Sequence, residues 1–286
     1  MEEWIMVIHP ERFIKRMLGK SKAYKTEDLK MEANYHTHTW RCRHASGTER
    51  DYIENAIDHG IKILGFSDHT PYPFPDGYTS GFRMHTGQLD DYVMTLEMLR
   101  DEYRDDIEIH IGLEAEYYPA YFSDLLRLLD DYPIEYLLLG QHFLGNERGD
   151  SYSGMPTASE KKLARYVDQT KEAMATGRFA YFAHPDLFNF IGSAEVYDRY
   201  MRELCESAKA LHIPLELNFL GLYDGRNYPN PQFWEIAGEV GCDVIFGADA
   251  HSPDMVWNPW SLGEAQAMAE KYRLHLIRTL ELNDHI

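Results

Sequence analysis

One repeated pattern constrains this chain most: a short apolar run, a burst of polar residues, and then an amphipathic stretch. The runs have the length and composition of buried strands, and the stretches between them have the apolar spacing of helices. Strands that are apolar throughout and alternate with helices form parallel sheets covered by helices. The runs lie at residues 33–39, 61–70, 107–117, 136–143, 179–186, 213–219 and 242–251.

Helix signals separate these runs. Thr48 is a predicted N-cap of a helix that ends before Gly60, and Thr157 with Glu160 has the spacing of a capping box. About seven strand–helix units predict an α/β fold, a distorted TIM-like (β/α)7 barrel with its active site at the C-terminal ends of the strands. An open doubly wound sheet would gather its ligands in fewer loops. Further helices are expected over 87–103, from Ser123, and over 157–177, 196–212 and 230–241.

The barrel is expected to occupy residues 31–286 as a single domain. Residues 1–30 would be an N-terminal extension of unknown role, because the first strand begins just after Met31. The extension lacks the apolar core of a secretory signal, and no later segment is apolar enough to span a membrane. The cysteines are odd in number and sparse, which suggests a reducing compartment and a cytoplasmic location; they are Cys42, Cys205 and Cys242.

The charge of the chain limits its partners. The formal net charge is −19, with 47 acidic residues against 28 basic ones. Nucleic acids are recognised by basic surfaces, so no nucleic-acid partner is expected. A small phosphorylated substrate stays compatible with this charge, because bound metal ions reverse the local field.

Histidines and carboxylates fill the polar bursts. His36 and His38 are two residues apart on a strand, so both side chains point to the same face, and Asp249 and His251 repeat this spacing on the last run. Imidazoles and carboxylates that come from many strand ends to one place are suited to bind a metal cluster. The expected ligands are His36, His38, His44, His69, Glu114, His142, His184, Asp249 and His251.

Other acidic and soft side chains have supporting roles. Glu114 and Glu116 share one face of the third strand, where buried acids are costly unless they are paired or metal-bound. We expect Glu114 to bridge two metals and Glu116 to orient ligands or contact substrate. Asp68 points away from its neighbour His69 and would support a ligand. Cys42 is a lesser candidate as a soft ligand, because nitrogen and oxygen donors are plentiful nearby.

The motifs HTHT, SDH, GLEAE, QHF, AHPD and GADAH, in this order between Asn34 and Pro253, resemble those of the PHP (polymerase and histidinol phosphatase) family. The resemblance implies a distorted seven-stranded barrel and three metal ions, of zinc, manganese or iron. One ion would take His36, His38, Glu114 and Asp249, a second Glu114, His142 and His184, and a third His44, His69 and His251. Glu114, Asp249 and His251 would be the catalytic residues.

The resemblance is greatest to the histidinol-phosphatase branch of the family. It implies a metal-dependent phosphomonoester hydrolase that acts on L-histidinol phosphate in histidine biosynthesis. Asn189 and Tyr223 stand near positions where the family tends to carry basic residues. Substrate contacts are therefore expected from Arg226, and from Arg83 and His85 in an aromatic loop over residues 71–85.

Other functions remain open at this point. Another sugar phosphate or a nucleotide would suit the same metal chemistry. A nuclease is disfavoured by the acidic charge, and a non-catalytic metal-binding module by the complete ligand set. A binuclear amidohydrolase usually places a lysine at a central strand end, and no predicted strand here ends in lysine.

Overall fold

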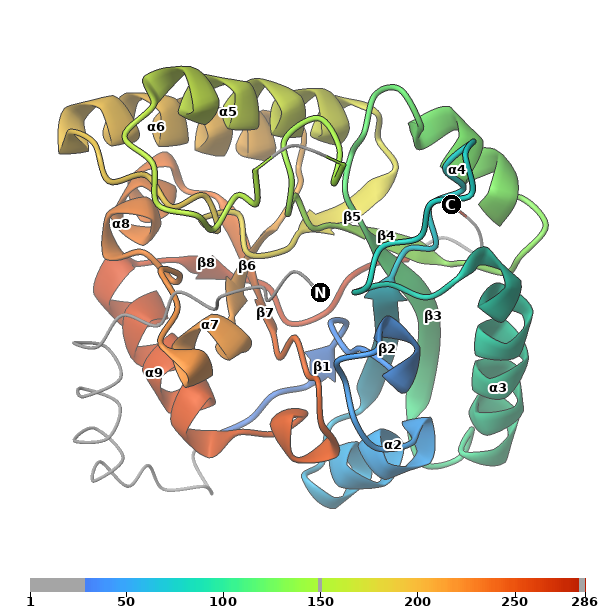
Figure 1. Cartoon of the computed structure of the whole chain (residues 1–286). Helices are drawn as coiled ribbons and strands as arrows, with labels where there is room; N and C mark the ends of the chain where they lie inside the picture. The colour runs from blue at the N-terminus through green and yellow to red at the C-terminus, as the bar shows by residue number, and fades with distance from the viewer. Residues whose placement is uncertain (1–28, 149–150, 283–285) are drawn as a thin grey trace.

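The computed structural model describes residues 29–148, 151–282 and 286, so residues 1–28 of the expected extension lie outside it. Its strands form one sheet that follows the chain order, and the helices surround this sheet (Figure 1). All neighbouring strands run parallel, which confirms the predicted TIM-like α/β barrel. The strands are β1 (Ala33–Asn34), β2 (Ile63–His69), β3 (Glu108–Ala115), β4 (Tyr136–Leu139), β5 (Phe179–Phe182), β6 (Leu215–Asn218), β7 (Asp243–Gly247) and β8 (His275–Leu276).

The helices follow the predicted alternation. None of those described combines the length and apolar character that a membrane crossing requires. The α-helices are α2 (Glu49–Asp58), α3 (Leu89–Glu102), α4 (Phe122–Leu129), α5 (Glu160–Ala175), α6 (Ala194–Ala210), α7 (Phe219–Asp224), α8 (Pro231–Val240) and α9 (Pro259–Tyr272). Three 3-10 turns are η2 (Trp40–Cys42), η3 (Thr86–Gln88) and η4 (Pro253–Met255).

The helix caps were predicted with mixed success. Thr48 caps α2 in a capping box with Asp51, and Gly60 follows the helix with a φ of 77°. The capping box predicted at Thr157 is wrong, because α5 begins at Glu160 and Ser159 caps it. Thr157 instead forms a parallel bridge with Phe190, which ties the segment before α5 to the loop after β5.

The barrel closes directly at the end where the strands finish. Thr37 and Ala250 form a parallel bridge between the continuations of β1 and β7. The His38 N–H donates to the Ala250 carbonyl at 3.0 Å, and the Ala250 N–H donates to the His36 carbonyl at 3.2 Å. The two His- and Asp-bearing segments are therefore held side by side by main-chain bonds.

The opposite end of the barrel is closed by the C-terminal segment. The two-residue strand β8 pairs with the start of β7 and adds to the seven strands expected. Beyond it, the Leu280 N–H donates to the Tyr35 hydroxyl at 3.1 Å. The barrel interior holds a buried apolar cluster that includes Tyr35, Tyr136, Leu138, Tyr181 and Ile245. This cluster separates the polar end of the barrel from the C-terminal segment.

Tyr136 crosses the barrel interior. Its hydroxyl donates to the carbonyls of Tyr35 and Phe66, at 2.8 and 3.0 Å. A Cβ built on Gly65 or on Gly112 would overlap the Tyr136 side chain. Glycine on β2 and β3 therefore makes room for an aromatic side chain of β4.

We predict that Gly112→Ala lowers the free energy of unfolding by about 1–3 kcal/mol, because the added methyl group overpacks the barrel interior. Urea denaturation of the full-length protein measures this change. Gly81→Ala is the matched control, since nothing lies within 4 Å of the Cβ it would gain. Equal stability of the two variants would contradict this account of the interior.

Candidate metal centre

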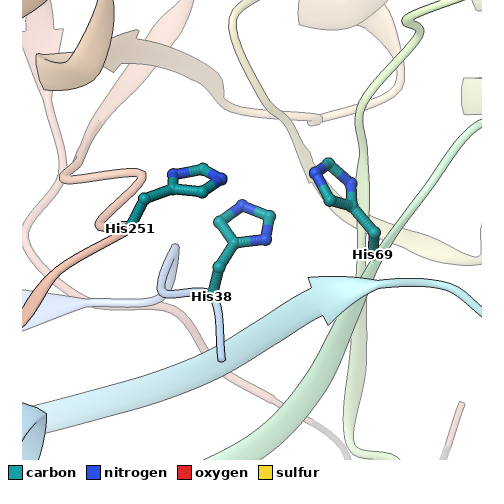
Figure 2. Close-up of side chains that lie close together, drawn as sticks. All are labelled: His38, His69 and His251. Atoms are coloured by element: carbon teal, nitrogen blue, oxygen red, sulfur yellow. The ribbon is translucent and has the colours of Figure 1, made fainter. Parts of the chain in front are cut away.

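The side chains of all the expected metal ligands meet at the C-terminal end of the barrel. Figure 2 shows three of them, His38, His69 and His251, which reach the same space from different segments of the chain. The ring centroid of His38 lies 4.1 Å from that of His251 and 4.4 Å from that of His69. Several groups of three donor atoms lie within 4.8 Å of one another, among them His36, His38 and Asp249.

The two oxygens of Glu114 face different histidines. Oε1 lies 2.8 Å from His184 Nε2 and 3.5 Å from His142 Nε2. Oε2 lies 3.0 Å from His69 Nδ1, and between 3.6 and 3.7 Å from the Nε2 atoms of His38 and His36. A Cβ on Gly140, just after β4, would overlap this carboxylate. The side chain thus stands at the centre of the cluster, in a space that a neighbouring glycine leaves open.

Asp249 completes the other side of the cluster. Its Oδ1 lies 3.1 Å from His38 Nε2 and 3.5 Å from His36 Nε2. His251 and His44 approach each other at the outer edge, with 3.0 Å between their Nε2 atoms. The main chain has positive φ at Asp249 (50°) and at His184 (34°), a conformation that is unfavourable for non-glycine residues and often found at functional sites.

Most of these imidazoles have Nδ1 beside an oxygen. The partners are a carboxylate for His36 (Glu216, 2.7 Å), for His38 (Asp68, 3.4 Å) and for His142 (Glu116, 2.9 Å). For His44 and His251 they are the main-chain carbonyls of Cys42 and Asp249, at 2.8 and 3.0 Å. An Nδ1–H that donates to oxygen leaves the Nε2 lone pair free to bind a metal. These contacts therefore favour the tautomer in which Nδ1 carries the hydrogen and Nε2 can bind a shared metal ion.

Electrostatics keep the carboxylates ionised. Burial opposes the charge of Glu114, but the imidazoles of His142, His69 and His36 hold its pKa well below the ordinary value. The pKa of Asp249 is lowered in the same way against burial, chiefly by His36 and His38.

The histidines divide into two groups. Despite burial, hydrogen bonds to Asp249 and Asp68 raise the pKa of His38 to about 9. Burial and the charge on His38 lower the pKa values of His44, His69 and His251. Metal ions bind neutral imidazoles and displace protons from the others, so such a set suits cation binding.

Three buried donor atoms test whether the site fits a metal. His69 Nδ1, Glu114 Oε2 and His184 Nδ1 have no hydrogen-bond partner among the described residues. Buried polar atoms are rarely left unpaired, and such exceptions point to an absent ion or water. The first two of these atoms lie 3.0 Å apart, so both border the space that a bound cation would occupy. The donor set of imidazole and carboxylate fits zinc, manganese or iron.

Arg83 is committed to side chains of the protein. It is 1 % exposed, and its guanidinium donates to Glu116 Oε2 at 3.0 Å, to Glu147 Oε2 at 2.5 Å and to the Thr70 carbonyl at 2.6 Å. Glu116 in turn accepts from His142 Nδ1. Arg83 therefore ties the aromatic loop to the support of a candidate ligand, and the structure gives it no open face for a phosphate.

The aromatic loop reaches the cluster through Phe82. The Phe82 ring lies edge-on to His69, with 5.5 Å between centroids, and 6.5 Å from His142. His85 is exposed, and its Nδ1 lies 3.2 Å from Thr79 Oγ1. Its backbone caps η3. Phe82 thus presents an apolar ring to His69 and His142.

Arg226 lies on the loop after α7, and Tyr228 connects it to the cluster. Its guanidinium donates to the Tyr228 hydroxyl at 3.0 Å and to Asp224 Oδ2 at 3.0 Å. The Tyr228 ring lies against His184, with 5.6 Å between centroids. Burial disfavours the charge of Arg226, but neighbouring groups that include Asp249 raise its pKa. The arginine is half-buried at the rim of the site.

Two further observations complete the site. Cys42 lies near His44 and His251, but burial raises the pKa of its thiol well above the ordinary value, which disfavours a thiolate ligand.

Glu216 was not predicted from the sequence, although it is fully buried and contacts His36. A signal was present, because Glu216 is a lone acid inside the apolar run IPLELNF.

Comparison with known proteins agrees with this geometry. The PHP domain family matches residues 34–219, more than half of the chain, and the chain belongs to this family. A probable histidinol-phosphatase from Deinococcus radiodurans is 28 % identical over 227 residues, which cover 77 % of this chain and 86 % of that protein. The family resemblance seen in the motifs is therefore confirmed.

Solved structures show the same fold. Histidinol phosphate phosphatase from Lactococcus lactis, in complex with zinc, L-histidinol and phosphate, superposes with a TM-score of 0.68 at 18 % identity, over 87 % of this chain and 98 % of that chain. A putative histidinol phosphatase from Listeria monocytogenes gives 0.69 at 20 % identity, over 80 % and 98 %.

We predict that Glu114→Gln leaves the fold intact but removes bound metal and abolishes turnover. The neutral amide cannot replace a carboxylate whose two oxygens serve different ligand groups. Removal of a residue that only supports ligands typically lowers metal affinity about 10–100-fold, and the loss in Glu114→Gln should be larger. Elemental analysis and circular dichroism check this, with the exposed Glu97→Gln on α3 as control. Normal metal content in Glu114→Gln would refute the central role of this carboxylate.

Proposed function

We propose that this protein is a metal-dependent histidinol-phosphatase, which hydrolyses L-histidinol phosphate to L-histidinol and phosphate. The observation that carries the proposal is the cluster of imidazoles and carboxylates around Glu114, in a chain that belongs to the PHP domain family. The relatives named above as histidinol-phosphatases support the substrate. The enzyme is a phosphoric monoester hydrolase that uses metal ions.

The ligand geometry supports three metal ions. His36, His38 and Asp249 would hold one with Glu114 Oε2, and His142 and His184 a second with Glu114 Oε1. A third would take His44, His69 and His251. Bound divalent ions would supply Lewis-acid polarisation of the phosphoryl group and activation of water.

The remaining side chains shape the site around the substrate. Phe82 lies edge-on to His69 and near His142, so it gives this side of the cluster an apolar neighbour. Arg226 offers a fixed positive charge beside Tyr228, and guanidinium groups bind phosphoryl oxygens in a bidentate manner. Asn189 is neutral and does not supply this charge, and its amide donates to the Gly154 carbonyl at 3.1 Å. Arg226 is therefore our candidate for the phosphate contact.

The substrate is tested with the full-length protein loaded separately with zinc, manganese or iron. We expect the highest kcat/KM for L-histidinol phosphate, lower values for sugar phosphates, nucleotides and p-nitrophenyl phosphate, and the lowest for a phosphodiester. If histidinol phosphate were hydrolysed no faster than the aryl ester, the substrate assignment would fail while a general phosphomonoesterase would remain.

We predict that Arg226→Ala lowers kcat/KM for histidinol phosphate about tenfold or more, because a charge-assisted hydrogen bond contributes about 1.5–3 kcal/mol. Steady-state kinetics measure the change, and metal content should stay as in the unmodified protein. The control is Arg199→Ala on α6, whose exposed side chain pairs with Glu160. Unchanged kinetics of Arg226→Ala would exclude this arginine from phosphate binding.

A further inference from the structure

A second buried carboxylate, that of Glu216, lies directly beneath the cluster on β6. Its side chain is completely inaccessible to solvent. Glu216 is not one of the metal ligands assigned above, although its Oε1 lies 2.7 Å from His36 Nδ1. A buried carboxylate without a charge or hydrogen-bond partner is strongly unfavourable, so its contacts define its role.

Four donors surround this carboxylate. Oε1 accepts from His36 Nδ1 at 2.7 Å and from the Tyr181 hydroxyl at 3.1 Å. Oε2 accepts from the His184 N–H at 3.0 Å and from Asn218 Nδ2 at 2.8 Å. An ionised carboxylate has about four lone-pair sites, so these donors leave none for a metal ion. Glu216 therefore acts on the ligands and does not join them.

The contacts of Glu216 reach three ligands on three different segments. The bond to His36 Nδ1 directs the His36 Nε2 lone pair toward Glu114 Oε2 and Asp249 Oδ1. The bond to the His184 N–H holds that residue where its φ is positive (34°). Asn218 Nδ2 also donates to Asp249 Oδ2 at 3.1 Å, so it links Glu216 to the third ligand.

The barrel leaves a dedicated space for this side chain. Gly247 on β7 pairs in register with Asn218, and a Cβ on Gly247 would overlap the Glu216 carboxylate. Gly140 has the same relation to Glu114. The two buried carboxylates thus each occupy a gap that a glycine provides, Gly247 on β7 for Glu216 and Gly140 directly after β4 for Glu114.

We propose that Glu216 is a positioning residue that sets His36, His184 and Asp249 in their metal-binding orientations. The proposal rests on the metal site of the proposed function, but it does not depend on which phosphate ester is the substrate. Carboxylates that hold the second nitrogen of a metal-binding histidine typically change metal affinity about 10–100-fold when they are removed.

The test is zinc binding by the full-length Glu216→Gln variant, measured by competition with a chelator and by elemental analysis after dialysis. We expect zinc affinity about 10–100-fold below that of the unmodified protein, with a circular dichroism spectrum like that of the parent. Glu135→Gln is the matched control. Glu135 Oε2 lies 2.9 Å from His110 Nδ1, so it is also a carboxylate–imidazole pair, but neither residue contacts the cluster.

A second readout separates positioning from a merely structural role. Zinc should raise the Tm of Glu216→Gln less than it raises the Tm of the parent. If only the zinc-free Tm fell, while zinc affinity and the zinc-induced rise stayed at the parent values, the proposal would be overturned. If Glu216→Gln does not fold, Tyr181→Phe decides, because it removes only one of the four donors. It should weaken zinc binding severalfold, and parental affinity in that variant would overturn the proposal.

The two proposals fail in different ways. A parent protein that binds zinc but does not hydrolyse histidinol phosphate would contradict the proposed substrate and leave the role of Glu216 to the zinc measurements. If the parent hydrolyses histidinol phosphate but Glu216→Gln binds zinc as tightly as the parent, only the positioning role is contradicted.

Discussion

The buried carboxylate of Glu114 is the constraint around which the rest of the site is arranged. A charge at this depth needs compensation, and imidazoles on several segments supply it from both sides. The same demand explains Gly140, whose missing side chain leaves room for the carboxylate. Glu216 is a second buried carboxylate, and hydrogen-bond donors that include His36 Nδ1 and Asn218 Nδ2 surround it. The candidate ligands and the side chains that contact them thus form a connected polar network at this end of the barrel.

Below this network the barrel interior becomes apolar. Tyr136 and Tyr181 are large, but their hydroxyl groups are bonded, Tyr136 to main-chain carbonyls and Tyr181 to Glu216. The C-terminal segment closes the bottom through β8 and Leu280. A well-packed apolar base holds the strands that carry the polar side chains in fixed positions, as a preorganised metal site requires.

The rim of the site differs from the base, because its charged side chains are already partly engaged. Arg83 neutralises Glu116 and Glu147, and this buried network attaches the aromatic loop to the support of His142. Arg226 remains at the rim beside Tyr228. The arginine proposed for phosphate binding thus lies on the loop after α7, and the aromatic loop places the ring of Phe82 near His69.

The sequence alone determined the alternation of strands and helices, the barrel class and the candidate ligands, because period and spacing are local properties. His36 with His38 and Asp249 with His251 were predictable, since residues two apart on a strand share one face. Only the tertiary structure decided what Arg83 contacts, how β8 closes the barrel and which groups surround Glu216. Those outcomes depend on residues distant in the chain: Glu147 for Arg83, Tyr35 for Leu280, and His36 for Glu216. No local pattern encodes such pairings.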